Sequence, residues 1–369
     1  MYKDLNNEDV MHVENKLSEL ERQASETIHN IVSVSQTKDK IVLIRKDLED
    51  LRKFLFIMNY RNGHRWSQFT SERFDSATRL EVKNFMKQYN LQRPEEVWLQ
   101  NIREILDTPH SEVKDNQKIF SIDRYDYKHR MMECFLVIWQ AGENDEFIIT
   151  NNGFGIFEGI TGIVVPFQFV YHSFYVISPK LVLVLCFGAF RQEVGTDRLY
   201  EHFGGKRSMF ENVPHPAAIT NYVGPVNTSC RESNNEEFNG NDIYDLHSHL
   251  FNKNLNSMGL KTQWNDTFTF PFVKINSATV NLVNFFLLNE VNPDLILTFL
   301  SRPYLYKTIV KYHKVKNVGV KHDFSNLKKN LFMALNRTHK DDLHLRKNIP
   351  AGHQTCNWNV RETNSGSKL

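Results

Sequence analysis

The sequence predicts an α+β protein, with a helical N-terminal half packed on a mixed β-sheet and helices returning at the C-terminus. Two observations predict this class. Apolar residues recur at helical spacing through most of the chain before Glu146, and they do so again after Asn276. Between these regions, Leu181–Phe187 is continuously apolar and rich in valine and leucine, which is typical of a strand buried on both faces.

The ordered part is expected to form a single domain over residues 1–345. Phe54–Met58, inside the second expected helix, is apolar on every side, so it needs a sheet to cover it. Residues 191–267 are rich in Gly, Asn and Ser and are expected to form an irregular insertion, with a local helix near Asp245–Leu255. Residues 346–369 have little apolar surface to bury and are expected to be a disordered tail.

Composition limits the class of protein. The 369 residues carry a formal net charge of +2, which does not indicate a nucleic-acid partner. The four cysteines contain no Cys-x-x-Cys pair, which argues against a zinc ribbon or a thioredoxin-like centre. The chain has no apolar signal-peptide core and no apolar run near the roughly 20 residues that cross a bilayer. We therefore expect a soluble cytoplasmic protein with no membrane span, and the sequence specifies no cofactor.

The first expected helix covers about Asn7–Ser33. Its apolar residues alternate in steps of three and four, as in a heptad seam: Val10, Val13, Leu17, Leu20, Ala24, Ile28 and Ile31. One interpretation is a homodimer formed through a coiled coil of this helix. The other, which we favour, is a helix packed on its own domain, because the repeat is barely long enough for a self-sufficient coil.

A central helix is expected over about Arg45–Asn62, after a short strand or lead-in at Ile41–Ile44. The first half of this helix is amphipathic, with acids near its start. Arg61, His64 and Arg65 lie near its end, which is the order that the helix macrodipole favours. The cationic cluster therefore has a structural explanation.

Three further helices are expected before the sheet. Ser71 is expected to cap a helix that ends at Tyr89. Pro94 is expected to open the next helix, which Asp107-Thr108-Pro109 stops. Asp123–Ala141, with many apolar residues, is expected to form the last of the three.

The expected strands are Glu146–Thr150, Gln168–Ile177, Lys180–Phe187 and Phe268–Lys274. Gly153, Gly155 and Gly159 are interpreted as turns, because the lysine of a phosphate-binding loop is missing beside them. The C-terminal helices are expected from Ser277 onward, at Tyr304–Tyr312 and at Asp323–Arg337.

Five stretches of the chain share the pattern of one family: Tyr2–Asp9, Leu51–Asn62, Pro94–Trp98, Glu146–Asn152 and Ile177–Leu181. Together they resemble the domain of unknown function numbered 4238, which is known from fungi and bacteria. Leu51–Asn62 is the most specific stretch, and a weaker similarity lies at Asn276–Asn284. The family has no established activity, so the resemblance implies a fold and module boundaries and no function.

The chain departs from the family pattern in two places. Members usually begin with His-x-x-Pro followed by Leu-Arg-x-Phe, and this chain starts after that point, so we expect a truncated member. Many members carry Thr-Ser-Asp-Asn-Pro where this chain has Thr150-Asn151-Asn152-Gly153. If either motif carries chemistry in the family, this chain is expected to lack that chemistry.

The sequence offers one metal-binding pattern, Asp245, His247 and His249 at alternate positions. In a strand or loop, two histidines at i and i+2 point to one face and can both ligate a metal. His202 and His215 would join this site only if the fold brought them there. The surrounding segment is irregular and rich in asparagine, which favours a surface loop instead.

The patterns for catalysis are weaker. A nuclease needs clustered acids and a base, and Asp145, Glu146, Glu158 and Lys180 flank the expected strands without a diagnostic spacing. Gly-x-Ser-x-Gly is absent, and Cys186 lies in an apolar strand with no sequence signal for an activating histidine. The cations from Lys328 to Lys347 are interleaved with acids, which favours a solvated helix face over a nucleic-acid patch.

Polar residues follow apolar elements where each is expected to leave the core, and such exits commonly gather at one edge of a sheet. We therefore expect one polar pocket, lined by Arg61, Arg65, Asn151 and Asn152. Arg61 would bind an anionic group there through its planar fork. The alternative is that Arg61 pairs with an acid, such as Glu146 or Glu158, and ties helix to sheet.

Two functional classes remain open from the sequence. The class that we favour is a non-catalytic binding or regulatory module. The other is a divergent metal-dependent hydrolase or nuclease-like enzyme, with a polar cleft around Arg61.

Overall fold

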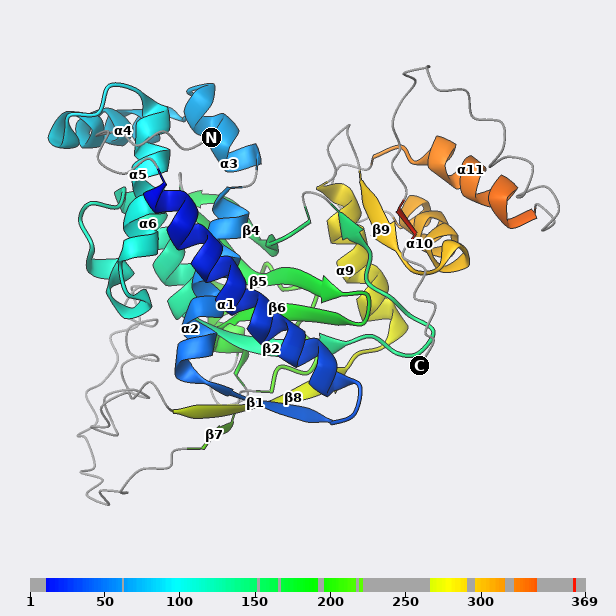
Figure 1. The fold of residues 1–369 in the computed structure, drawn as a ribbon. Coiled ribbons are helices and arrows are strands. Elements are labelled where there is room, and N and C mark those ends of the chain that lie inside the picture. The colour runs from blue at the N-terminus through cyan, green and yellow to red at the C-terminus, as the bar shows by residue number, and fades with distance from the viewer. Residues whose placement is uncertain are drawn as a thin grey trace. The chain divides into compact units, whose positions relative to one another are not determined.

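A computed structural model describes residues 11–61, 63–150, 153–164, 167–191, 196–216, 219–221, 266–290, 296–315, 322–336 and 361–362. Helices and strands are both present, which confirms the α+β class (Figure 1). The contacts between Cα atoms divide the chain into two compact units. Unit 1 is Met1–Ile138, Phe157–Ser173 and Leu183–Val273, and unit 2 is Trp139–Ile156, Phe174–Val182 and Lys274–Leu369. The single domain expected over residues 1–345 stays a prediction.

Unit 1 begins with helix α1 (His12–Ser35), strand β1 (Lys40–Ile44) and helix α2 (Arg45–Tyr60). The apolar stripe of α1 is buried, and the helix packs on α2 and on α5 (Pro94–Asp107) of the same unit. Five residues of the expected dimer seam are therefore buried inside the chain: Val13, Leu17, Leu20, Ala24 and Ile31. Ile28 is half-buried, and Val10 lies outside the described residues. This burial favours a helix packed on its own domain over a coiled-coil dimer. None of the described helices is long and apolar enough to cross a membrane.

Leu55, Phe56 and Ile57 of α2 have almost no exposed surface, as expected for a central helix, whereas Phe54 and Met58 are half-buried, so the helix is not covered on every side. Two neighbouring cations of α2, Arg52 and Lys53, donate to backbone carbonyl oxygens of other elements. Arg52 donates to the carbonyl oxygens of Met131 and Cys134, and Lys53 Nζ donates to the Thr108 carbonyl oxygen at 2.6 Å. Carbonyl groups at the C-terminus of a helix lack intrahelical partners and carry partial negative charge, so Lys53 stabilises the end of α5 at Thr108. Arg52 joins α2 to the backbone around Met131 and Cys134.

The helix expected to begin at Ser71 begins later. Helix α3 (Gly63–Thr70), which the sequence analysis missed, comes first, and α4 covers Ser76–Tyr89. Asp75 caps α4, because its Oδ1 accepts the backbone N–H groups of Ala77 and Thr78 at 3.0 Å each. Aspartate is among the preferred residues at this position, which explains why the helix starts there. The expected bounds of α5 are confirmed, with proline in its first turn.

The single helix expected over Asp123–Ala141 is wrong. The chain forms helix α6 (Ser121–Tyr127), a π-helical turn η2 (Lys128–Met132) and then strand β2 (Cys134–Gln140). All residues of β2 but the last are buried. A continuously buried apolar run has no periodicity that separates a helix from a strand, and here the run takes a central place in the sheet.

The main sheet has the strand order β1-β8-β2-β6-β5-β4, and β7 also pairs with β8 (Figure 1). Its other strands are β4 (Ile156–Val164), β5 (Phe167–Ser178), β6 (Leu181–Phe187), β7 (Ile219–Asn221) and β8 (Thr267–Lys274). The sequence analysis missed β4 because its glycine was interpreted as a turn. A Cβ at Gly159 would meet the Phe169 carbonyl oxygen at 2.1 Å, so glycine permits the close approach of β4 to β5.

The remaining elements of unit 1 are η1 (His110–Asp115), η3 (Gly188–Phe190) and α7 (Asp197–His202). Both α7 and β7 fall in the region expected to be an irregular insertion. The helix expected near Asp245–Leu255 lies outside the described residues.

Unit 2 contains a small mixed sheet, in which β9 (Leu297–Phe299) pairs antiparallel with β3 (Ile149–Thr150) and parallel with β10 (Arg361–Glu362). Its helices are α9 (Ser277–Asn289), α10 (Arg302–Lys314) and α11 (Ser325–Asn336). The Asn276 side chain caps α9, one residue before the expected cap. Within the expected disordered tail, the structure describes only β10.

Candidate functional site

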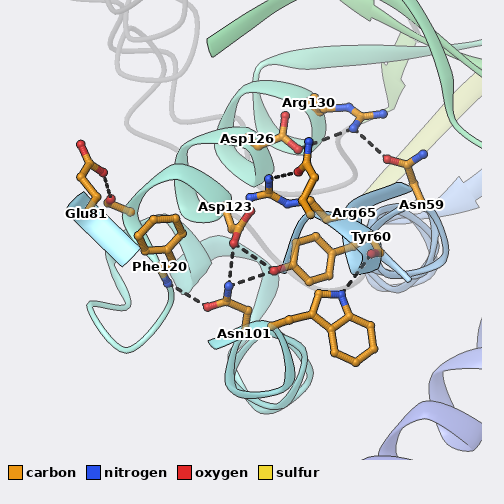
Figure 2. Close-up of polar contacts among 12 residues, drawn as sticks. Asn59, Tyr60, Arg65, Glu81, Asn101, Phe120, Asp123, Asp126 and Arg130 are labelled. Carbon is orange, nitrogen blue, oxygen red and sulfur yellow. Dashed lines mark hydrogen bonds and ion pairs between the residues drawn. The ribbon is translucent and has the colours of Figure 1, made fainter. Parts of the chain in front are cut away.

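Four polar side chains meet between α2, α3, α5 and α6, and Figure 2 shows their contacts; we call Tyr60, Arg65, Asn101 and Asp123 the Asp123 network. The Tyr60 hydroxyl donates to Asp123 Oδ2 at 2.9 Å. Asn101 Nδ2 lies 2.6 Å from the same oxygen and 2.9 Å from the Tyr60 hydroxyl. Arg65 forms an ion pair with Asp123 Oδ1. Both carboxylate oxygens therefore have donors, and the network joins four helices.

The electrostatics of this network are those of a structural element. Burial raises the pKa of Asp123, and the positive charge of Arg65 opposes that rise. Burial also raises the pKa of Tyr60 well above its ordinary value, so the hydroxyl keeps its proton and remains a donor. The polar atoms of these side chains satisfy one another, which is how buried networks hold a fold together.

The sequence analysis places Arg61 and Arg65 in one polar pocket. Arg65 belongs to the Asp123 network, and Arg61 forms an ion pair with Glu21 of α1 at 3.2 Å. The other residues of the expected pocket, Asn151 and Asn152, lie outside the described part of the chain. The anion-binding pocket therefore stays a prediction.

A second set of buried polar side chains lies on three neighbouring strands. Strand β4 carries Glu158, β5 carries His172 and β6 carries Cys186, and the segment after α7 adds Ser208 and His215. In that order, the exposed fractions of these five residues are 7, 0, 0, 3 and 6%. We call the five residues the histidine cluster.

His172 lies at the centre of the histidine cluster. Its Nδ1 is 2.9 Å from Glu158 Oε2, and its Nε2 is 2.8 Å from Nε2 of His215. Ser208 Oγ donates to the same carboxylate oxygen at 3.0 Å, and the Met209 N–H donates to Oε1 at 3.1 Å. Glu158 therefore holds both the ring of His172 and the segment that carries His215.

The outer nitrogens of the two rings show where the ring protons lie. Because a carboxylate only accepts, Glu158 favours a proton on Nδ1 of His172, and in the neutral ring Nε2 then keeps a lone pair. A hydrogen bond to the Val213 backbone raises the pKa of His215. A bond that favours the protonated ring is one that the ring donates, so its acceptor is the Val213 carbonyl oxygen. Since Nε2 of His215 faces His172, Nδ1 is the nitrogen left for that carbonyl. With neutral rings in these tautomers, two lone pairs point at each other across 2.8 Å, and either a proton on one Nε2 or a metal ion between them relieves their repulsion.

Cys186 supplies a third donor beside these nitrogens. Ligand atoms of His172, Cys186 and His215 all lie within 4.8 Å of one another. Burial and the neighbouring His172 lower the pKa of His215 to about 3, so the ring is neutral, as a metal ligand must be. Burial raises the pKa of the Cys186 thiol well above its ordinary value. A bound metal ion would supply the positive charge that a thiolate needs at this position.

Two imidazoles and a thiolate form a ligand set suited to Zn²⁺ and related transition metals. The carboxylate of Glu158 orients His172 in the way that outer carboxylates orient metal-ligating histidines. In a tetrahedral zinc site, two nitrogens about 2.0–2.1 Å from the metal lie roughly 3.3 Å apart. The two Nε2 atoms, now 2.8 Å apart, would therefore separate by about 0.5 Å on binding a metal.

The sequence analysis noted Glu158, Cys186 and His215 separately and did not single out His172. An imidazole inside a largely apolar strand is a signal that could have identified His172, because a buried polar group needs a partner. No sequence pattern places His215 beside that strand. The metal pattern that the sequence does offer, Asp245, His247 and His249, lies outside the described residues and stays a prediction.

The acids and the lysine considered for a nuclease have other contacts. Glu146 Oε1 accepts the backbone N–H groups of Leu300 and Ser301 at 3.2 and 3.1 Å, just before α10. Lys180 Nζ donates to the carbonyl oxygens of Gly142, Glu143 and Asp145. These contacts hold loops in place, which is a structural role.

Comparison with known proteins identifies a family and no characterised relative. The sequence model of the family described as "Protein of unknown function (DUF4238)" matches residues 1–292, which include the whole histidine cluster. The resemblance found in the sequence is thereby confirmed. No curated protein and no solved structure matches the chain.

Proposed function

The chain belongs to the DUF4238 family of proteins of unknown function, and from its own geometry we propose that it is a non-catalytic module that binds one transition-metal ion. The ligands are His172, Cys186 and His215, and Zn²⁺ is the ion that this donor set suits best. Glu158 orients His172 from outside the ligand set.

The observation that carries this proposal is the approach of the two Nε2 atoms to 2.8 Å. Two neutral imidazoles can share one hydrogen bond at this distance only if one of them points a proton at the other. The Glu158 carboxylate and the Val213 carbonyl each favour a proton on the outer nitrogen instead. A metal ion between the rings satisfies both inner nitrogens without moving either outer proton.

Burial supports a structural or regulatory metal over a catalytic one. His172 and Cys186 have no exposed surface, and Phe190 packs on both histidine rings, at 4.6 Å from His172 and 5.1 Å from His215. A catalytic metal needs a position that substrate can reach. The described donors number three, so a buried water is the simplest fourth ligand.

The proposal is tested by metal titration of the full chain after removal of bound metal with a chelator. We expect one equivalent of Co²⁺ to give a sulfur-to-cobalt charge-transfer band, and Zn²⁺ to displace it and raise the melting temperature. Cys186→Ala should abolish the band, and His172→Gln or His215→Gln should weaken binding. His110→Gln is the matched control, because His110 is a partly buried histidine whose Nδ1 contacts the Tyr127 hydroxyl at 2.7 Å, outside the cluster.

The same titration distinguishes a metal bound at the histidine cluster from a metal bound by Asp245, His247 and His249. A double variant, His247→Gln with His249→Gln, should retain the charge-transfer band and the bound equivalent. If that variant loses the metal while Cys186→Ala keeps it, the ligands are those of the sequence pattern and the histidine cluster is a hydrogen-bonded core. Absence of any thiolate band in the parent protein would also refute the proposal.

A further inference from the structure

Helices α10 and α11 of unit 2 form a basic pair; we call Arg302–Lys314 and Ser325–Asn336 the basic hairpin. The two helices pack against each other. Together they carry six lysine and arginine residues and no aspartate or glutamate, whereas the whole chain has a net charge of only +2. Asp323, just before α11, accepts the Ser325 N–H at 2.8 Å, so it is engaged at the helix start.

The cations of α10 lie on its outer side. Lys307, Lys311 and Lys314 follow one another at intervals of four and three residues, so they form one stripe, and all three are exposed. The opposite side of the helix packs inward, with Leu305 and Ile309 fully buried. The stripe therefore presents positive charge to a partner outside the chain.

α11 combines cations with exposed apolar side chains. Phe332, Met333 and Leu335 are 55, 41 and 38% exposed. Lys328 and Lys329 precede Phe332 and Met333 by four residues each, so each lysine neighbours an apolar side chain on the helix surface. Phe332 also lies beside Tyr306 of α10, with ring centroids 6.1 Å apart, which joins the apolar patch to the basic stripe.

We infer that the basic hairpin is a docking surface for an anionic lipid bilayer. Lysine ammonium groups would contact the lipid phosphate and carboxylate groups, while the exposed side chains of α11 enter the region between headgroups and acyl chains. Charge complementarity selects an anionic partner. Two of the three exposed apolar side chains, Met333 and Leu335, are aliphatic, which favours lipid over single-stranded nucleic acid, because nucleic-acid bases stack on aromatic rings.

This docking surface is independent of the proposed metal centre. The basic hairpin belongs to unit 2, and the histidine cluster belongs to unit 1. Metal-free protein and metal-loaded protein are therefore both suitable for the test, and failure of one proposal does not affect the other.

The test is co-sedimentation of the full chain with vesicles of phosphatidylcholine alone and of phosphatidylcholine mixed with phosphatidylserine. We expect binding to the mixed vesicles that weakens as salt is added. Lys328→Gln with Lys329→Gln should lower the partition coefficient by about 30-fold, which corresponds to about 1 kcal/mol for each lysine. The matched control is Lys83→Gln with Lys87→Gln, two exposed lysines of α4.

The apolar contribution has its own pair of variants. Phe332→Ser should lower the partition coefficient by about tenfold or more, given the usual gain on burying a Phe side chain. Leu80→Ser, at a residue that is 61% exposed on α4, should leave it unchanged. Equal binding to both kinds of vesicle, or equal loss in the control variants, would overturn the inference. So would binding to an oligonucleotide or an acidic peptide without binding to anionic vesicles.

Discussion

Tyr60 of α2 and Asp123 of α6 are joined by a buried hydrogen bond of 2.9 Å, from the tyrosine hydroxyl to Oδ2 of the carboxylate. Tyr60→Phe removes one donor and leaves the others, so we expect a loss of about 1–3 kcal/mol in the free energy of unfolding. Asp123→Ala leaves Arg65 without its ion-pair partner in a largely buried position and should cost about 3–5 kcal/mol. Urea denaturation measures both changes.

Glu81 provides the control for this network. It accepts a hydrogen bond from Ser121 at 3.0 Å in an exposed position beside the network (Figure 2). Glu81→Gln should change the free energy of unfolding by less than about 0.5 kcal/mol. If Asp123→Ala is no more destabilising than Glu81→Gln, the network does not hold the helices together.

Gly159 is expected to tolerate no larger side chain. A Cβ at this position would meet backbone atoms of β5, the Phe169 carbonyl oxygen at 2.1 Å and the Val170 Cα at 2.9 Å. Gly159→Ala must therefore shift one of two paired strands, at a cost of about 1–3 kcal/mol or more. Gly142→Ala is the control, since its Cβ would meet Asp145 Oδ2 at an ordinary 3.5 Å. Equal melting temperatures for the two variants would contradict the tight pairing.

Sequence reasoning located elements whose signals are local. The start of α5 follows from a proline in the first turn, because the missing N–H of Pro94 costs nothing there. The prediction was wrong at strand β2, because an apolar run buried on both faces has no periodicity that separates a strand from a helix. Strand β4 was not predicted, because glycine is needed at position 159 to let the neighbouring strand β5 approach closely, and no local sequence pattern indicates that contact.

The candidate site shows the same limit more strongly. Glu158 and His172 are 14 positions apart and meet across a pair of strands, which alternation along each strand could suggest. His215 is 43 positions from His172 and reaches it through an irregular segment. Such a segment has no periodicity, so its path is decided by tertiary contacts, here the hydrogen bonds of Ser208 and Met209 to Glu158.

His110 is expected to make the fold sensitive to acid. Burial, with Arg52 and Lys53 nearby, lowers the pKa of His110 to about 3, whereas in the unfolded chain it titrates near 6.5. Below about pH 6.5 the unfolded state binds the proton and the folded state does not, so stability falls as pH falls toward 3. The contribution is at most about 1.4 kcal/mol per pH unit.

Two variants isolate this effect in urea denaturation between pH 4 and pH 8. His110→Gln removes the titrating ring and should flatten the dependence of stability on pH. Tyr127→Phe removes the hydroxyl at 2.7 Å from the ring but keeps the ring, so it should lower stability without flattening the dependence. An unchanged slope in His110→Gln would assign the acid sensitivity to other groups.

The anion pocket expected around Arg61 has its own test. The ion pair with Glu21 joins partly exposed side chains, so Arg61→Ala should cost no more than about 1 kcal/mol. If Arg61 binds anions, the parent protein should show a higher melting temperature with phosphate or sulfate, and Arg61→Ala and Arg61→Lys should lose that increase. A large loss of stability in Arg61→Ala, with no effect of anions on the parent, would make Arg61 a structural residue.

Glu158 links the proposed metal centre to its surroundings, so Glu158→Gln should weaken metal binding although Glu158 is not itself a ligand. The amide group of glutamine has one acceptor oxygen where the carboxylate has two, and it cannot accept from His172, Ser208 and Met209 in the same geometry. Loss of such an outer partner typically lowers metal affinity by about 10–100-fold. Isothermal titration of the metal-free protein with Zn²⁺ measures this change.

Ser208→Ala distinguishes two possible roles of Glu158: orienting the ring of His172, and fixing the segment that carries His215. It removes a donor to Glu158 Oε2 but leaves the contact of 2.9 Å between Glu158 and His172. If Glu158 acts by orienting the ring, Ser208→Ala should retain most of the Zn²⁺ affinity that Glu158→Gln loses. Equal losses in the two variants would show that the carboxylate acts mainly by fixing the segment that carries His215, and unchanged affinity in both would place the metal, if one binds, elsewhere in the chain.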